Sequence, residues 1–271
     1  MAPEAKIAVP SAAANGKNGH TLISDAKFRQ LYALAVKLHL MAEGGDLLTG
    51  GHEAALAGVV ADLRDNDVLV AHGEPRIAAL LHGGVPKAQN GKGSASASSL
   101  NERVIEATGR AVADRMRKNG RVTVIYLPSL EAAAVLDESK RLAERARLPV
   151  LFVEEAPEWR TPARKSHANG AADSAWMPAI PVDADDVVAM YRVAHESIAR
   201  AREGSGPTRI LCVPDPEADV QTRQRSANAA ASLEHWLAAR GLPAQEWRQQ
   251  IAVELGQQGA SRWRKIRIEG L

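Results

Sequence analysis

Three polar residues follow segments that have the composition of buried strands: His72, Arg76 and Ser129. Ser129 also precedes an apolar segment with helical spacing, so its hydroxyl lies where a helix is expected to begin. Backbone amides at a helix start attract anions, and His72 and Arg76 can add positive charge. The pattern is compatible with an anion site, but a cap in which Ser129 satisfies the free amides and nothing binds is the simpler interpretation.

The other groups able to do chemistry do not form a catalytic set. A histidine at a strand end, such as His72, is more often structural than catalytic when no second titrating group accompanies it. Cys212 lies in an apolar segment and is expected to be a buried small hydrophobe. Four further histidines lack the spacing of metal ligands: His39, His82, His195 and His235. The sequence therefore predicts no catalytic residue and no metal ligand.

Strands and helices alternate along the segment that must position these residues. Helices over 100–118 and 130–147 and a helix starting at Asp183 or Asp185 separate short apolar runs. The runs are bounded by turn-forming residues and predict strands over 67–73, 121–127, 148–154, 179–183 and 208–213. Uninterrupted apolar runs are typical of parallel strands covered on both faces. The predicted fold class is α/β, with a mostly parallel sheet flanked by helices.

The flanking segments define the expected domain organisation. Residues 1–23 are rich in Ala, Gly, Asn and Ser and predict a disordered tail. Helices are expected over 24–43 and 52–64, and two more after residue 225, separated at Gly241–Pro243. Residues 24–214 then form one α/β domain and 215–271 a helical extension.

Composition limits the class of protein. Hydrophobic residues make up 45% of the 271 residues, charged residues 24%, and the formal net charge is only +2. These values favour a globular protein without a strongly basic nucleic-acid surface. A single cysteine excludes an internal disulfide, no apolar run reaches membrane-spanning length, and the first residues lack a secretory pattern. We expect a cytoplasmic protein that binds neither membrane nor nucleic acid.

Several stretches, in order, resemble one family: the alpha subunit of thiamine-diphosphate-dependent 2-oxo acid dehydrogenases, the decarboxylating first (E1) component of those complexes. Its early Gly-Gln-Glu-Ala appears here as Gly51-His52-Glu53-Ala54, with Gly58 and Asp67 placed as in the family. "ESKRLAERARLPVLFV" is similar to the helix and strand after the family's metal-binding loop. The resemblance covers about residues 25–256 and implies the thiamine-diphosphate-binding fold.

The positions that the family uses for chemistry differ here. Aligned through Leu148-Pro149-Val150, the Gly-Asp-Gly metal loop falls on Leu127-Pro128-Ser129, and the following Asn-Asn pair begins at Ala156. Neither Pro128 nor Ala156 has a side-chain ligand for Mg²⁺, which prefers oxygen donors. The Tyr-Arg pair that contacts the diphosphate in the family falls on Gly73-Glu74. A carboxylate in place of the arginine would repel the diphosphate instead of attracting it. The resemblance thus implies the scaffold, with a degenerate cofactor site.

Three hypotheses follow. In the first, the chain has lost Mg²⁺ and thiamine diphosphate and acts as a non-catalytic structural or regulatory oligomer, as a homo-oligomer or with a beta-subunit-like relative. In the second, it remains a dehydrogenase alpha subunit with a rebuilt cofactor site, which would require replacement ligands; Glu74, Glu154 and Glu155 are the nearby acids. In the third, it is a different α/β domain that binds an anion at Ser129.

Overall fold

The computed structural model describes residues 23–43, 53–71, 100–127, 133–155, 177–213 and 229–257. The predicted disordered tail, residues 1–23, lies outside these ranges except for its last residue. Within them, none of the helices is both long and apolar enough to cross a lipid bilayer.

The centre of the fold is a five-stranded parallel sheet with strand order β1-β2-β3-β5-β4. Its strands are β1 (Val68–Val70), β2 (Thr123–Leu127), β3 (Val150–Glu155), β4 (Ala179–Asp183) and β5 (Thr208–Val213). All five residues of β2 are buried, as expected for a strand covered on both faces. The α/β prediction is confirmed.

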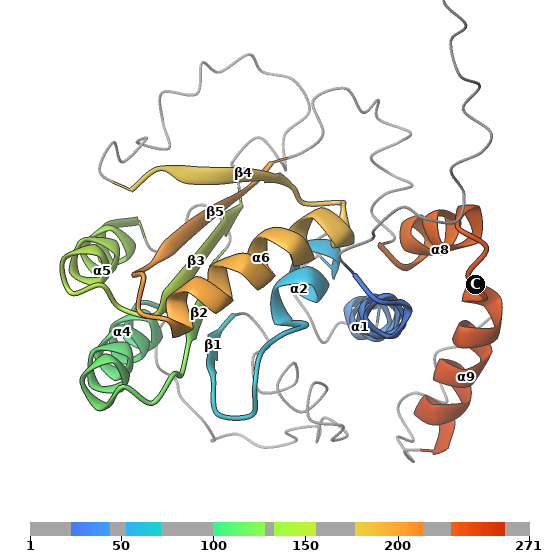
Figure 1. Cartoon of the computed structure of the whole chain (residues 1–271), viewed down its shortest axis with the longest axis horizontal. Helices are drawn as coiled ribbons and strands as arrows, with labels where there is room; N and C mark the ends of the chain where they lie inside the picture. Colours follow the sequence, from blue (N-terminus) through green and yellow to red (C-terminus); the bar gives the residue numbers. More distant parts are fainter. Residues whose placement is uncertain are drawn as a thin grey trace, which may run out of the picture.

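Helices cover both faces of the sheet (Figure 1). On one face lie α4 (Leu100–Arg117) and α5 (Ala133–Arg145), which pack on Ile125, Val150 and Phe152. The other face carries α1 (Asp25–Glu43), α2 (Glu53–Val60) and α6 (Val187–Arg202), with α8 (Ala229–Ala239) and α9 (Ala244–Gln257) beyond them. The two C-terminal helices separate at Gly241–Pro243 as predicted.

Gly58 allows α2 and α6 to pack closely. A Cβ at this position would lie 2.7 Å from both the Met190 Cβ and the Tyr191 backbone nitrogen. Side-chain movement cannot relieve a clash with backbone, so only glycine fits without shifting a helix. The close packing of α2 on α6 therefore explains why this chain has glycine at position 58, as the family does.

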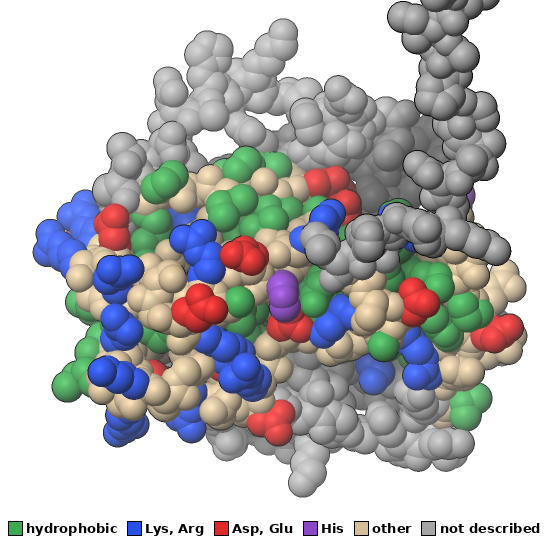
Figure 2. All heavy atoms as spheres, viewed as in Figure 1, with side chains coloured by type: hydrophobic (Ala, Val, Ile, Leu, Met, Phe, Trp, Pro, Cys, Tyr) green, Lys and Arg blue, Asp and Glu red, His purple; other side chains and the backbone are tan. Residues whose placement is uncertain are grey.

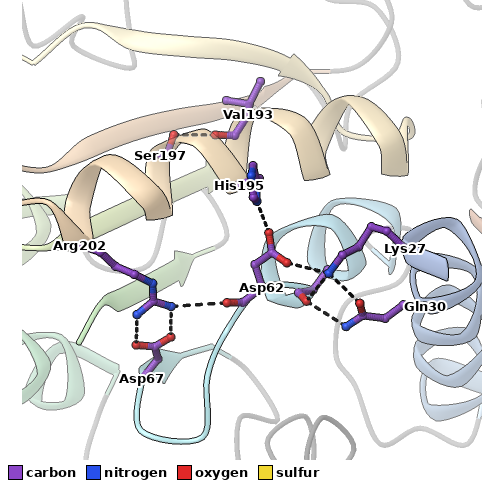
Figure 3. A network of polar contacts seen from close by, with 9 residues as sticks. Lys27, Gln30, Asp62, Asp67, Val193, His195, Ser197 and Arg202 are labelled. Atoms are coloured by element: carbon purple, nitrogen blue, oxygen red, sulfur yellow. Dashed lines mark hydrogen bonds and ion pairs between the residues drawn. The ribbon is translucent and has the colours of Figure 1, made fainter. Parts of the chain in front are cut away.

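Asp67 and Arg202 form a buried ion pair at the amino edge of the sheet, the edge where the parallel strands begin (Figure 3). The two Asp67 oxygens lie 3.0 and 2.5 Å from the Arg202 Nη1 and Nη2 atoms, and Asp67 also accepts from the amides of Arg64 and Val122. Arg202 donates to the Gly120 carbonyl at 2.9 Å. This one contact joins the starts of β1 and β2 to the end of α6.

The cap of α6 differs from the prediction. Neither Asp183 nor Asp185 caps the helix; Asp186 does, and its Oδ1 accepts from the amides of Val188 at 2.8 Å and Ala189 at 2.9 Å. Asp183 instead accepts from the Asp185 amide within the preceding turn. Three aspartates within four residues all suit such a turn, and the position where β4 ends decides which one caps.

Candidate functional site at the carboxyl edge

The sheet topology brings three predicted site positions to one edge. Because β1, β2 and β3 are parallel neighbours, their carboxyl ends meet at the edge where open α/β sheets bind ligands. Leu127 ends β2 and Glu155 ends β3, while His72 follows Ala71 just after β1. The segments that begin at His72, Pro128 and Ala156 therefore start from adjacent strand ends.

Only one of the predicted site residues lies within the described residues. Leu127 is 2% exposed, and its side chain belongs to the apolar cluster beneath α4 and α5. It fills the core, so it adds no ligand. The others lie outside the described residues, and their roles stay predictions: His72, Gly73, Glu74, Arg76, Pro128, Ser129 and Ala156.

Glu154 is held between two buried cations. Its carboxylate lies 2.7 Å from the Lys140 Nζ of α5 and 3.0 and 3.3 Å from two guanidinium nitrogens of Arg209 on β5. The side chains of Lys140 and Arg209 are only 3% and 4% exposed. Glu154 pairs in register with Leu127, so this network lies directly beside the end of β2.

Glu155 points to the opposite face of the sheet, because side chains alternate along a strand. The Tyr126 hydroxyl donates to its Oε1 at 3.1 Å, and both residues are buried. Burial, and the nearby negative charge of Glu155, raise the pKa of Tyr126 well above its usual range, so the phenol stays protonated. Buried Glu53 on α2 raises the same pKa, so it also acts on this side of the sheet.

Cys212 on β5 is fully buried, as predicted. Burial, and the negative charges of Glu155 and Glu154, raise the pKa of its thiol far above the usual range. The thiolate is the nucleophilic form of cysteine, so this residue cannot act as a nucleophile near neutral pH. It is a core residue.

The described side chains at this edge do not fit a magnesium-bound diphosphate. Mg²⁺ takes carboxylate or amide oxygens together with phosphate oxygens. Glu154 is already neutralised by Lys140 and Arg209, and Glu155 is buried and accepts from Tyr126. Among the described residues no three His, Cys, Asp or Glu side chains gather in a way that could hold a metal ion.

The sequence analysis missed Lys140, Arg209 and Tyr126. Helical periodicity treats a charged residue as exposed, so it gives no sign that Lys140 is buried. An arginine inside the otherwise apolar "TRILCV" was the available signal, because a buried guanidinium requires a carboxylate partner. Glu154 at the end of a neighbouring strand is that partner.

His195 lies away from this edge, on the outer side of α6 (Figure 3). Its Nδ1 contacts Asp62 Oδ2, and the other Asp62 oxygen lies 2.7 Å from the Lys27 Nζ. Burial alone would raise the pKa of Asp62, but the hydrogen bonds from Lys27 and His195 outweigh it and hold the pKa below its usual value. Asp62 therefore links α1, the end of α2 and α6.

Comparisons with known sequences identify related proteins. Residues 33–213 match the family described as "Dehydrogenase E1 component". The alpha subunit of 3-methyl-2-oxobutanoate dehydrogenase from Mycobacterium tuberculosis is 32% identical over 139 residues, which cover 47% of this chain and 38% of that subunit. The alpha subunit of acetoin:2,6-dichlorophenolindophenol oxidoreductase from Bacillus subtilis is 28% identical over 230 residues, covering 72% and 69%.

Structural similarity is weaker. A transketolase variant from Pichia stipitis aligns with 89% of this chain and 48% of its own, at a TM-score of 0.43 and 12% identity, a likeness too low to support a conclusion. The matched stretch spans less than half the length of the mycobacterial subunit. The family match covers more than half of this chain. The chain belongs to the Dehydrogenase E1 component family.

Proposed function

We propose that this chain is a non-catalytic member of the family, related to its alpha subunits, that does not bind Mg²⁺ and thiamine diphosphate in the family's manner. In this role it acts as a structural or regulatory subunit. Residues 24–214 form its α/β domain and 215–271 a helical extension. The support comes from the carboxyl edge, where the resemblance places the cofactor.

The observation that carries this proposal is the state of Glu154. A rebuilt magnesium site would need an acid near the end of β2 or β3, and the nearby acids are Glu74, Glu154 and Glu155. Glu154 bonds to Lys140 and Arg209, and moving it to a metal would take this carboxylate away from buried Arg209 and leave buried Lys140 with the longer contact to Asp137, at 3.8 Å. Glu155 is 3% exposed and bonds to Tyr126. Glu74 lies outside the described residues.

The aligned positions point the same way. Pro128 and Ala156 stand where the family has metal ligands, and Glu74 stands where it has a cation beside the diphosphate. Two unit charges in contact near a protein surface interact by about 4 kcal/mol, so a reversal of sign changes the interaction by roughly twice that before solvent relaxes it. Even a small part of this change removes useful affinity.

Thermal melting tests the proposal directly. The melting temperature should be the same with and without sub-millimolar thiamine diphosphate and Mg²⁺, because a ligand that does not bind the folded state does not stabilise it. A rise of several degrees that requires both components would overturn the proposal. It would favour an alpha subunit with a rebuilt site. A rise with inorganic phosphate alone would favour an anion site at Ser129.

Restoring the family's residues is the matched experiment. The variant Glu74→Arg, Pro128→Asp, Ala132→Asn and Ala156→Asn should gain a cofactor-dependent rise in melting temperature that the natural chain lacks. The control carries Glu138→Asn and Glu144→Asn, two exposed positions on α5, and should gain none. If the restored chain behaves like the control, the residue alignment at this edge is wrong.

A further inference from the structure

The outer side of α4 carries apolar side chains that remain exposed among the residues the structure describes. Ile105 is 58% exposed and Met116 is 79% exposed. They stand 11 residues apart, three helical turns, with Gly109 and half-buried Val112 on the same side between them. On α5, which packs beside α4, Leu142 is 46% exposed. Apolar side chains gathered on one outer surface indicate a contact with another molecule.

Gly109 needs an explanation. A glycine inside a helix destabilises it relative to alanine, and close approach of another backbone is a common reason to retain one. A Cβ at Gly109 would meet nothing within 4 Å, so packing among the described residues does not require the glycine. The open space lies between Ile105 and Met116, where a second helix could approach.

The net charge of α4 differs between its two halves. Glu102 and Glu106 outweigh Arg103 in the first half, whereas Arg110, Arg115 and Arg117 outweigh Asp114 in the second, and Lys118 follows the helix. Lys and Arg side chains gather over the α4 and α5 side of the molecule, with hydrophobic side chains between them (Figure 2). A helix with this pattern is complementary to itself in the antiparallel direction, because each acidic half then faces a basic half.

We propose that α4 forms a two-fold antiparallel contact with α4 of a second copy of this chain. A two-fold axis between Gly109 and Val112 sets Ile105 opposite Met116 of the partner subunit and Gly109 opposite Val112 of the partner subunit. Arg117 then lies beside Glu102 and Glu106 of the partner subunit. Glu106 bonds within the helix to Arg110 at 2.6 Å, both side chains being about 60% exposed, and such pairs exchange partners at little cost.

A second copy fits this surface better than an unrelated partner for one reason. An isologous contact requires that one helix carry both halves of each pair, apolar with apolar and acid with base, at positions related by a single axis. Ile105 with Met116, Gly109 with Val112, and Glu102 or Glu106 with Arg117 meet that requirement. This inference rests on the proposed structural role and names its surface and partner.

Sedimentation of the full chain over a concentration range tests the contact. The natural chain should form a dimer, and Met116→Glu should weaken its association at least tenfold, because two carboxylates then enter the apolar contact. The matched control is Val253→Glu, another apolar residue that is 56% exposed but lies on α9. It should leave the dimer unchanged. A single cooperative melting transition for the Met116→Glu monomer would show that this variant folds.

A charge exchange tests the direction of pairing. Arg117→Glu should weaken association by placing three acids together, and adding Glu102→Lys and Glu106→Lys should restore it. A natural chain that stays monomeric would overturn the proposal, as would a dimer that Met116→Glu leaves intact. Failure of the triple variant to recover would overturn the antiparallel arrangement. The cofactor melting test is independent, so either proposal can fail while the other stands.

Discussion

The two edges of the sheet use buried ion pairs in different ways. At the amino edge, Asp67 and Arg202 join strand starts to α6, and every donor and acceptor that they contact belongs to this fold. At the carboxyl edge, Glu154 joins Lys140 and Arg209 where related folds are expected to bind a ligand. In the part of the chain that the structure describes, the buried carboxylates of Asp67 and Glu154 are both paired with cations of this chain.

Breaking the amino-edge pair should have the largest effect. Arg202→Ala leaves the Asp67 carboxylate, which is 1% exposed, buried without its cation. Removing one member of a buried ion pair costs about 3–5 kcal/mol of unfolding free energy. Urea unfolding at neutral pH measures the loss. The control Arg200→Ala removes an exposed arginine from the same helix and should change stability by less than about 0.5 kcal/mol.

Glu154→Gln sharpens the comparison at the other edge. The amide keeps the shape but removes the charge between Lys140 and Arg209, so unfolding free energy should fall by about 2–3 kcal/mol. The exposed Glu138→Gln on α5 is the control and should be close to neutral. Sites kept for ligands often gain stability when a charge is removed. A gain in Glu154→Gln would therefore indicate that this edge is held for a ligand and that the two edges differ.

Tyr126→Phe should have a smaller effect. It removes the hydroxyl that donates to Glu155 and leaves that carboxylate with one hydrogen bond fewer in a buried place. The expected loss is about 1–2 kcal/mol in urea unfolding. Tyr32→Phe is a useful counterpart, since the Tyr32 hydroxyl also donates to a carboxylate, Glu234, at 3.1 Å. Similar losses would indicate that the Tyr126 contact is structural, whereas a gain in Tyr126→Phe alone would argue against that role.

Sequence reasoning succeeded where one pattern decides the outcome. Apolar runs such as 121–127 predicted buried parallel strands, because a strand covered on both faces has no polar side. Sequence reasoning failed where the burial of a residue depends on a contact with a residue far away in the sequence. Buried Lys140 pairs with Glu154, which comes from β3, and Glu154 also pairs with Arg209 of β5; no local spacing encodes these contacts. The α6 cap was missed by one residue for a related reason, since β4 fixes which of three aspartates enters the turn.

The candidate site was predictable only in part. The alternation of elements and the family resemblance predicted a mostly parallel sheet, but the strand order that places the ends of β1, β2 and β3 together was not predicted and comes from the structure. The internal partners of Glu154 and Glu155 could not be predicted, because a glutamate at a strand end has the same sequence pattern whether it binds a metal or an arginine. Only the contacts between residues that are distant in the sequence distinguish a metal ligand from a partner of arginine.

Asp62→Asn is expected to have the smallest effect, and its pH dependence identifies its origin. The pKa of Asp62 lies below its usual value because the hydrogen bonds from Lys27 and His195 to the charged form outweigh the cost of burial. A carboxyl group whose pKa is lowered on folding stabilises the fold above its unfolded pKa, and that stabilisation is lost as pH falls through the lower, folded value. The variant should therefore be less stable near neutral pH and converge with the natural chain only at pH values below the lowered pKa of Asp62.

The size of this difference should stay under about 1 kcal/mol, because Lys27 and His195 are partly exposed and solvent screens the pair. Urea midpoints at several pH values measure it. The Lys27→Met background is the control, since removing the cation should shrink the effect of Asp62→Asn. A difference that persists unchanged at low pH would mean that Asp62 acts through shape rather than charge. In that case, stabilisation by a charged carboxylate, as at the two edges of the sheet, would not apply to the contact between α1, α2 and α6.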